Sequence, residues 1–182
     1  MDNPNSIEFT MKKKDDAGIR LMRAGIFIAC ILPFLILTML LMRYATQFIV
    51  ITAPALILTI YLCWFTGRFT RIEYEYVIIS GEFSVSAIYD NMSRKDLIKA
   101  VRIKDMHKIV PYFTNEPLLK SPEINQVLYY CSDLANPDLY IGIFDDEKRG
   151  RVALIFNTSR KLIQIMKFYN TLNVIVKNDF QF

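Results

Sequence analysis

The sequence has few residues of the kinds that build catalytic, metal or disulfide sites. Its 182 residues include one histidine and three cysteines. Cys30, Cys63 and Cys131 form no disulfide framework and lack the spacing of metal ligands. The sequence also contains no glycine-rich phosphate loop, dinucleotide fingerprint or nucleophile elbow. The site classes that short motifs reveal are therefore excluded.

The remaining candidates for chemistry are weak. His107 and Cys131 could form a nucleophile and base, but no third residue is identified that would orient the histidine. The acidic run Asp145–Glu147 is followed at once by cations in the same turn, and its spacing is not that of a calcium loop. We therefore expect a non-enzyme without catalytic residues, metal or cofactor.

Charge is absent from two long segments, Ala24–Met42 and Tyr44–Phe65. About 20 helical residues, at roughly 1.5 Å each, cross a hydrocarbon layer of roughly 30 Å, and neither segment shows the polar stripe of a soluble core helix. A signal peptide would have a shorter apolar core and a cleavage site. We predict a two-helix transmembrane hairpin over residues 24–66.

The cations predict the orientation of this hairpin. The short link Arg43–Gln47 holds one of them, whereas the outer flanks hold seven. These seven are Lys12, Lys13, Lys14, Arg20, Arg23, Arg68 and Arg71. Because cytoplasmic flanks carry the excess of Lys and Arg, we expect a two-span protein of the cell membrane with both termini cytoplasmic. Residues 1–23 are then a basic cytoplasmic segment.

Residues 67–182 show the alternation of β-strands. In Ile72–Ile79 and Glu82–Ile88, apolar and polar residues alternate, and Ser80–Gly81 supplies a tight turn between them. We predict seven strands, the other five being Leu97–Ile103, Lys108–Phe113, Val127–Cys131, Leu139–Phe144 and Arg151–Phe156. Thr114–Gln126, with two prolines, is expected to be an irregular loop.

A terminal helix follows the last strand. Asn157 or Thr158 is a candidate cap. The expected apolar face comprises Leu162, Ile165, Met166, Tyr169 and Leu172. The predicted fold is a membrane α-helical hairpin followed by an α+β domain, in which about seven antiparallel strands form a curled barrel or sandwich capped by this amphipathic helix.

This order of elements is that of a pleckstrin-homology (PH)-like domain. The stretches "IEYEYVIISGEFSV", "NMSRKDLIKAVRIKDMHKIVPY" and "VALIFNTSRKLIQIMKFY" resemble an uncharacterised family of small bacterial membrane proteins with two N-terminal spans and a bacterial PH-like domain. The resemblance implies a fold but no catalytic or binding residues. Eukaryotic PH domains bind phosphoinositides through a basic loop between their first two strands, and here that loop is only Ser80–Gly81.

A cationic stretch, Ser93–Lys108, is the main candidate surface. Its cations are Arg94, Lys95, Lys99, Arg102, Lys104 and Lys108. One interpretation is a solubilising surface or a charged edge strand that discourages aggregation. The other is a surface that faces anionic lipid or a protein partner. Nucleic acid is not expected as a partner, since the net charge is only +4 and many cations flank the predicted spans.

The sequence thus favours a membrane-anchored cytoplasmic module for protein binding or assembly at the inner leaflet. Its expected partners are the lipid bilayer and other membrane proteins or further copies of itself. The alternative is an accessory subunit of a membrane enzyme or transporter. Both predicted spans lack the ionisable residues that mark transport paths, which favours the binding module.

Overall fold

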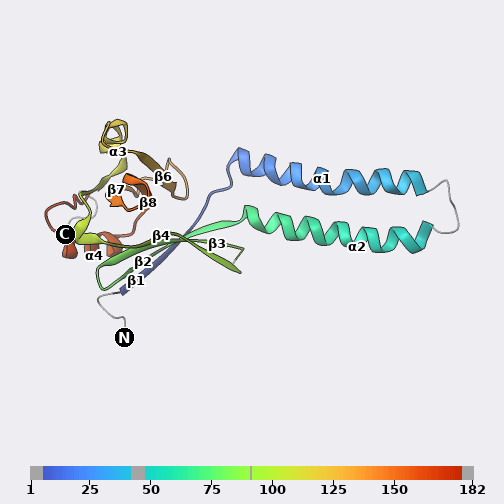
Figure 1. Cartoon of the computed structure of the whole chain (residues 1–182), viewed down its shortest axis with the longest axis horizontal. Helices are drawn as coiled ribbons and strands as arrows, with labels where there is room; N and C mark the ends of the chain where they lie inside the picture. Colours follow the sequence, from blue (N-terminus) through green and yellow to red (C-terminus); the bar gives the residue numbers. More distant parts are fainter. Residues whose placement is uncertain (1–5, 42–47, 91, 178–182) are drawn as a thin grey trace. The chain divides into compact units, whose positions relative to one another are not determined.

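The computed structural model describes residues 6–41, 48–90 and 92–177. The chain divides into two compact units. One is Lys14–Ile72, and the other combines the residues up to Lys13 with those from Glu73 onward. Each unit is therefore built from its own contacts, and the second is made of two separate stretches of sequence (Figure 1).

The helical unit contains α1 (Ala17–Leu41), α2 (Phe48–Gly67) and the short 3-10 helix η1 (Arg68–Thr70). α1 and α2 pack against each other. Both are long and apolar enough to cross a membrane, and the side chains of their apolar stretches are not buried in the protein. This agrees with the two predicted spans. Residues 42–47, which include the predicted link, lie outside the described residues.

The first sheet has the strand order β1-β2-β3-β4. Its strands are β1 (Ser6–Lys12), β2 (Ile72–Ile79), β3 (Glu82–Tyr89) and β4 (Ser93–Arg102). β1 was not anticipated from the sequence. It pairs antiparallel with β2, from Ser6 opposite Ile79 to Lys12 opposite Glu73. A strand that precedes α1 therefore completes a sheet whose other strands all follow α2.

The second sheet has the order β5-β7-β8-β6. Its strands are β5 (Lys108–Pro111), β6 (Gln126–Tyr130), β7 (Leu139–Asp146) and β8 (Gly150–Asn157). The expected curled barrel or sandwich of about seven antiparallel strands is corrected in part: the described residues form two four-stranded sheets, and β6 runs parallel to β8. The parallel pair is possible because the long connection after β5 lets the chain enter β6 from the same end as β8.

That connection is partly helical. The predicted strand Lys108–Phe113 stops at Pro111, and α3 (Tyr112–Asn115) and the 3-10 helix η3 (Glu116–Lys120) follow. Another 3-10 helix, η2 (Ile103–Asp105), joins β4 to β5. The prolines of this region restrict it to short turns rather than strands.

The terminal helix is α4 (Arg160–Tyr169). Its cap is Ser159, whose hydroxyl accepts a hydrogen bond from the Leu162 N–H at 3.3 Å, so neither predicted cap residue fills this role. The buried residues are Leu162, Ile163 and Met166. Leu172, expected on the buried face, is 94% exposed because the helix ends at Tyr169.

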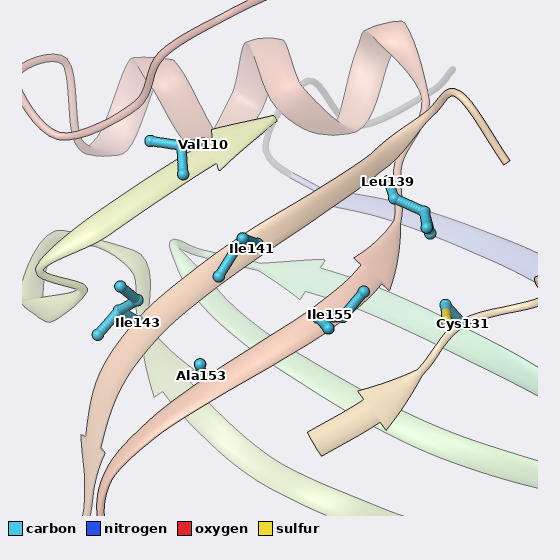
Figure 2. Close-up of a cluster of buried hydrophobic side chains, with 7 residues drawn as sticks. All are labelled: Val110, Cys131, Leu139, Ile141, Ile143, Ala153 and Ile155. Atoms are coloured by element: carbon cyan, nitrogen blue, oxygen red, sulfur yellow. The ribbon is translucent and has the colours of Figure 1, made fainter. Parts of the chain in front are cut away.

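The second sheet is buried on both faces. A cluster on one face contains Val110, Cys131, Leu139, Ile141, Ile143, Ala153 and Ile155. Figure 2 shows these side chains on the face turned away from α4 and the first sheet. Tyr112, Leu118, Leu119 and Ile124 from the α3–η3 region pack against this cluster. The α3–η3 segment is therefore a cover that shields an apolar face from water.

Two tight turns match the sequence. Ser80 and Gly81 have φ of 52° and 83°, the left-handed pair that a two-residue hairpin turn requires. Gly81 has a second role, since a Cβ there would lie 2.9 Å from the Tyr169 ring. The β2–β3 turn is therefore packed against the end of α4.

Candidate functional site

The six predicted cations do not lie on one strand face. Arg94, Lys95, Lys99 and Arg102 lie on β4, whereas Lys104 lies in η2 and Lys108 begins β5 in the other sheet. All except the half-buried Lys108 are exposed. Neighbouring Arg94 and Lys95 point to opposite faces of the sheet, as successive strand residues do. β4 is an edge strand, so these cations border the open edge of the first sheet.

Arg94 is engaged within the domain. Its Nη2 lies 2.7 Å from Glu75 Oε2, and its Nε lies 3.9 Å from Asp96 Oδ1. Glu75 is only 4% exposed, although it points away from the core that Tyr74 and Tyr76 enter. Arg94 therefore compensates a buried carboxylate, a structural role that the sequence pattern did not reveal.

Glu75 is also linked to Glu8 of β1. Burial raises the pKa of Glu75, and a hydrogen bond with Glu8 raises it further, while the Arg94 guanidinium opposes the rise. On the same face, the Ser86 hydroxyl donates a hydrogen bond of 3.0 Å to Asp96 Oδ1. These groups form a polar network across all four strands of the first sheet. Alternation predicted the polar face but not the contacts within it.

The other cations of β4, and Lys104 of η2, differ from Arg94 in their contacts. Within residues 6–41, 48–90 and 92–177, no carboxylate forms an ion pair with Lys95, Lys99, Arg102 or Lys104. We call these four residues the basic edge. Their charges are exposed and uncompensated, so the basic edge is the part of the predicted surface that is available to an anionic partner.

His107 and Cys131 have different surroundings. His107 Nε2 lies 2.7 Å from Asp145 Oδ2, and Arg151 donates to Asp145 at 3.1 Å and to Glu123 at 2.8 Å. Cys131 is buried, and burial raises its pKa to about 11, which keeps the thiol protonated and unreactive near neutral pH. The histidine therefore belongs to a surface network that fastens the β7–β8 hairpin to the preceding loop.

The acidic turn has an internal role. Asp146 Oδ1 accepts hydrogen bonds from the Lys148 and Arg149 N–H groups at 2.9 and 3.1 Å. Among the described residues, no three His, Cys, Asp or Glu side chains are grouped to hold a metal ion. The carboxylate of Asp146 thus shapes the hairpin turn that Gly150, with φ of 72°, completes.

Comparison with known proteins concerns almost the whole chain. A family model described as "Bacterial PH-like domain (DUF6106)" matches residues 6–176. No curated protein and no solved structure matches. The match begins at the first residue of β1 and includes both apolar helices. The chain therefore belongs to this family of bacterial PH-like domains.

Proposed function

We propose that this protein is a membrane-anchored, non-catalytic module whose PH-like domain binds or assembles with other proteins at the cytoplasmic face. Its basic edge lies on the anionic lipids of that leaflet. The observation that carries the proposal is the combination of two apolar helices with four exposed cations that form no ion pair among the described residues. The helices supply the anchor, and the cations supply an orienting contact.

The pairing of β1 with β2 supports the proposed topology. β1 precedes the helices and β2 follows them, yet the two strands share a sheet. If both helices span the bilayer, the chain must enter and leave the membrane on the same side. The flanking cations favour the cytoplasm for that side. A reporter fused after Phe182 should therefore be active in the cytoplasm, and activity only outside the membrane would contradict the proposal.

Electrostatics support the lipid contact. A cation held close to an anionic leaflet contributes about 1 kcal/mol, and the helices already keep the domain at high local concentration. Weak contacts from Lys95, Lys99, Arg102 and Lys104 are then sufficient to orient the domain. Strong lipid affinity is not required.

The test uses the full chain, because the domain needs β1. We would place it in nanodiscs of neutral or anionic lipid and measure hydrogen exchange of the β4 and η2 amides over a salt series. Anionic lipid should slow exchange at low salt, and Lys95→Gln, Lys99→Gln, Arg102→Gln and Lys104→Gln together should remove the effect. A matched control changes four exposed lysines elsewhere to Gln: Lys120, Lys148, Lys161 and Lys167. Equal exchange rates of the β4 and η2 amides in neutral and in anionic nanodiscs would refute the lipid-facing role.

A further inference from the structure

The segment over the outer face of the second sheet has the opposite charge to the basic edge. Residues 112–138 contain four acidic residues, Glu116, Glu123, Asp133 and Asp138, and one basic residue, Lys120. Residues 93–108 contain six basic residues and two acidic ones. Figure 1 shows α3 on the opposite side of β7 and β8 from β2–β4. The two segments thus differ in the sign of their net charge.

Aromatic side chains are exposed within the acidic segment. Phe113 of α3 is 56% exposed, and Tyr129 of β6 is 52% exposed. The Tyr112 ring lies edge-on to Phe113 with centroids 5.3 Å apart and packs on the buried cluster below. Tyr129 pairs with Ile155, a member of that cluster, so both point to the outer face. We call Tyr112, Phe113 and Tyr129 the aromatic patch.

The rings of Tyr112 and Phe113 are in contact, and Tyr112 packs on the same cluster face toward which Tyr129 points. Burial raises the pKa of Tyr112, and the nearby Glu116 and Tyr129 raise it further. Glu116 is exposed one helical turn from Tyr112. Glu123 is different because Arg151 holds it at 2.8 Å. The patch therefore combines three rings with one exposed carboxylate.

This combination suits a cation. Lys ammonium and Arg guanidinium groups bind the faces of Tyr and Phe rings, and a carboxylate beside the rings adds an ion pair. Aromatic residues are also enriched at protein interfaces, where burial of a few rings provides much of the binding energy. An anionic lipid surface or nucleic acid would instead be repelled by the net negative charge of the segment.

We infer that the aromatic patch and Glu116 bind a Lys- or Arg-containing segment beside a transmembrane helix of another membrane protein. The inference rests on the proposed function, since cytoplasmic flanks of membrane helices are where Lys and Arg concentrate. A domain tethered at that face meets such segments at high local concentration.

The first test measures binding of a defined probe. The full chain in neutral-lipid nanodiscs is titrated with a short fluorescent peptide that carries Lys and Arg between Gly and Ser, and with the same peptide carrying Gln in place of every cation. The basic peptide should bind, and the Gln peptide should not. Equal binding of the two peptides would overturn the inference.

The variants keep the surface apolar while removing the rings. Phe113→Leu with Tyr129→Leu should weaken binding by roughly 5–30-fold, since each ring contributes a cation–π contact. Glu116→Gln should weaken binding and reduce its salt dependence. Matched controls are Phe168→Leu, at a ring 76% exposed on α4, and Glu147→Gln in the β7–β8 turn. Hydrogen exchange of β7 checks that each variant is folded, and equal effects of the patch and control changes would overturn the inference.

The second test identifies the occupant in cells. A photo-crosslinking residue in place of Phe113 should form crosslinks that map to Lys- or Arg-containing segments beside a membrane helix of another protein. Crosslinks confined to lipid, to soluble proteins or to a second copy of this chain would overturn it. Neither the peptide binding nor its variants depend on membrane orientation. If the peptide fails to bind while the reporter fused after Phe182 is active in the cytoplasm, the binding role of the patch is rejected and the proposed function still stands.

Discussion

The second sheet buries all six residues Leu139–Phe144 of its inner strand β7, whereas the inner strand β3 of the first sheet buries four of its eight residues. The difference arises from what covers each outer face. The α3–η3 segment covers the second sheet, so its strands are apolar on both sides. The outer face of the first sheet carries the polar network of Glu75, Arg94 and Asp96, so its strands alternate between apolar and polar residues. The two sheets of one domain thus differ in how completely their strands are buried.

The largest expected loss of stability follows from a cavity in the covered face of the second sheet. Ile141→Ala should lower the free energy of unfolding by about 2–5 kcal/mol, because Ile141 is fully buried beneath the α3–η3 segment and the change leaves a cavity. Ile79→Ala, at a residue 59% exposed in the first sheet, should cost less than about 0.5 kcal/mol. Native-state hydrogen exchange of β7 measures both. Similar costs would show that the two sheets do not differ as described.

The next effect concerns the edge of the first sheet. Phe9→Ala removes a half-buried ring stacked on Tyr76 at a centroid distance of 6.0 Å, and should cost about 2 kcal/mol. The loss should be local: amides of β1 and β2 should exchange faster while those of β7 and β8 keep their protection. Uniform loss of protection in both sheets would mean that β1 is part of the same cooperative unit as the second sheet.

A smaller effect tests whether α4 joins the two halves. Its buried side chains lie beside β1 and η2, so weakening the helix should destabilise both sheets together. Ser159→Ala removes the hydroxyl that caps Leu162 N–H and should cost about 1 kcal/mol, whereas Ser159→Asp retains a cap. Thermal unfolding of the two variants gives the difference. Equal melting temperatures would exclude a capping contribution.

The smallest expected effect is a pH dependence of the first sheet. Because folding raises the pKa of Glu75, the folded protein keeps this proton to a higher pH than the unfolded chain does. The resulting stabilisation is complete below the ordinary glutamate pKa of about 4.3 and is lost as the pH rises through the raised value. Glu8→Gln removes one cause of the shift while Arg94 and Asp96 remain. Its unfolding free energy should therefore depend less on pH over this window, and an unchanged slope would contradict the assignment.

Local patterns predicted much of this fold. Uniform apolarity predicted α1 and α2, alternation predicted β2 and β3, and the Ser80–Gly81 turn has the expected backbone. What could not be predicted depends on distant partners. β1 has the short alternating sequence "SIEFTMK", and only its pairing with β2 makes it a strand. The parallel pairing of β6 with β8 also depends on distant partners. In α4, Ile163 is buried although the helix pattern did not place it on the apolar face, whereas Leu172, which the pattern did place there, is exposed.

The candidate surface shows the same limit. Counting cations located the basic edge, but it could not show that Arg94 would be withdrawn to neutralise Glu75, because that contact crosses the sheet. The aromatic patch was missed because Tyr112 and Phe113 were expected in a strand and Tyr129 in an unrelated one. A charge count of residues 112–138 was the signal that could have drawn attention to it.

The position of β1 ahead of both helices sets an order of events during synthesis. The ribosome releases β1 first, but β2 emerges only after residues 13–71 have been made. At roughly 5–20 residues per second, β1 waits unpaired for several seconds while the helices leave the ribosome. The first sheet therefore begins to form only after both apolar helices have been made. If both helices span a bilayer, as proposed, misplacement of either one would leave β1 and β2 on opposite sides, and correct insertion would be a precondition for folding of the first sheet.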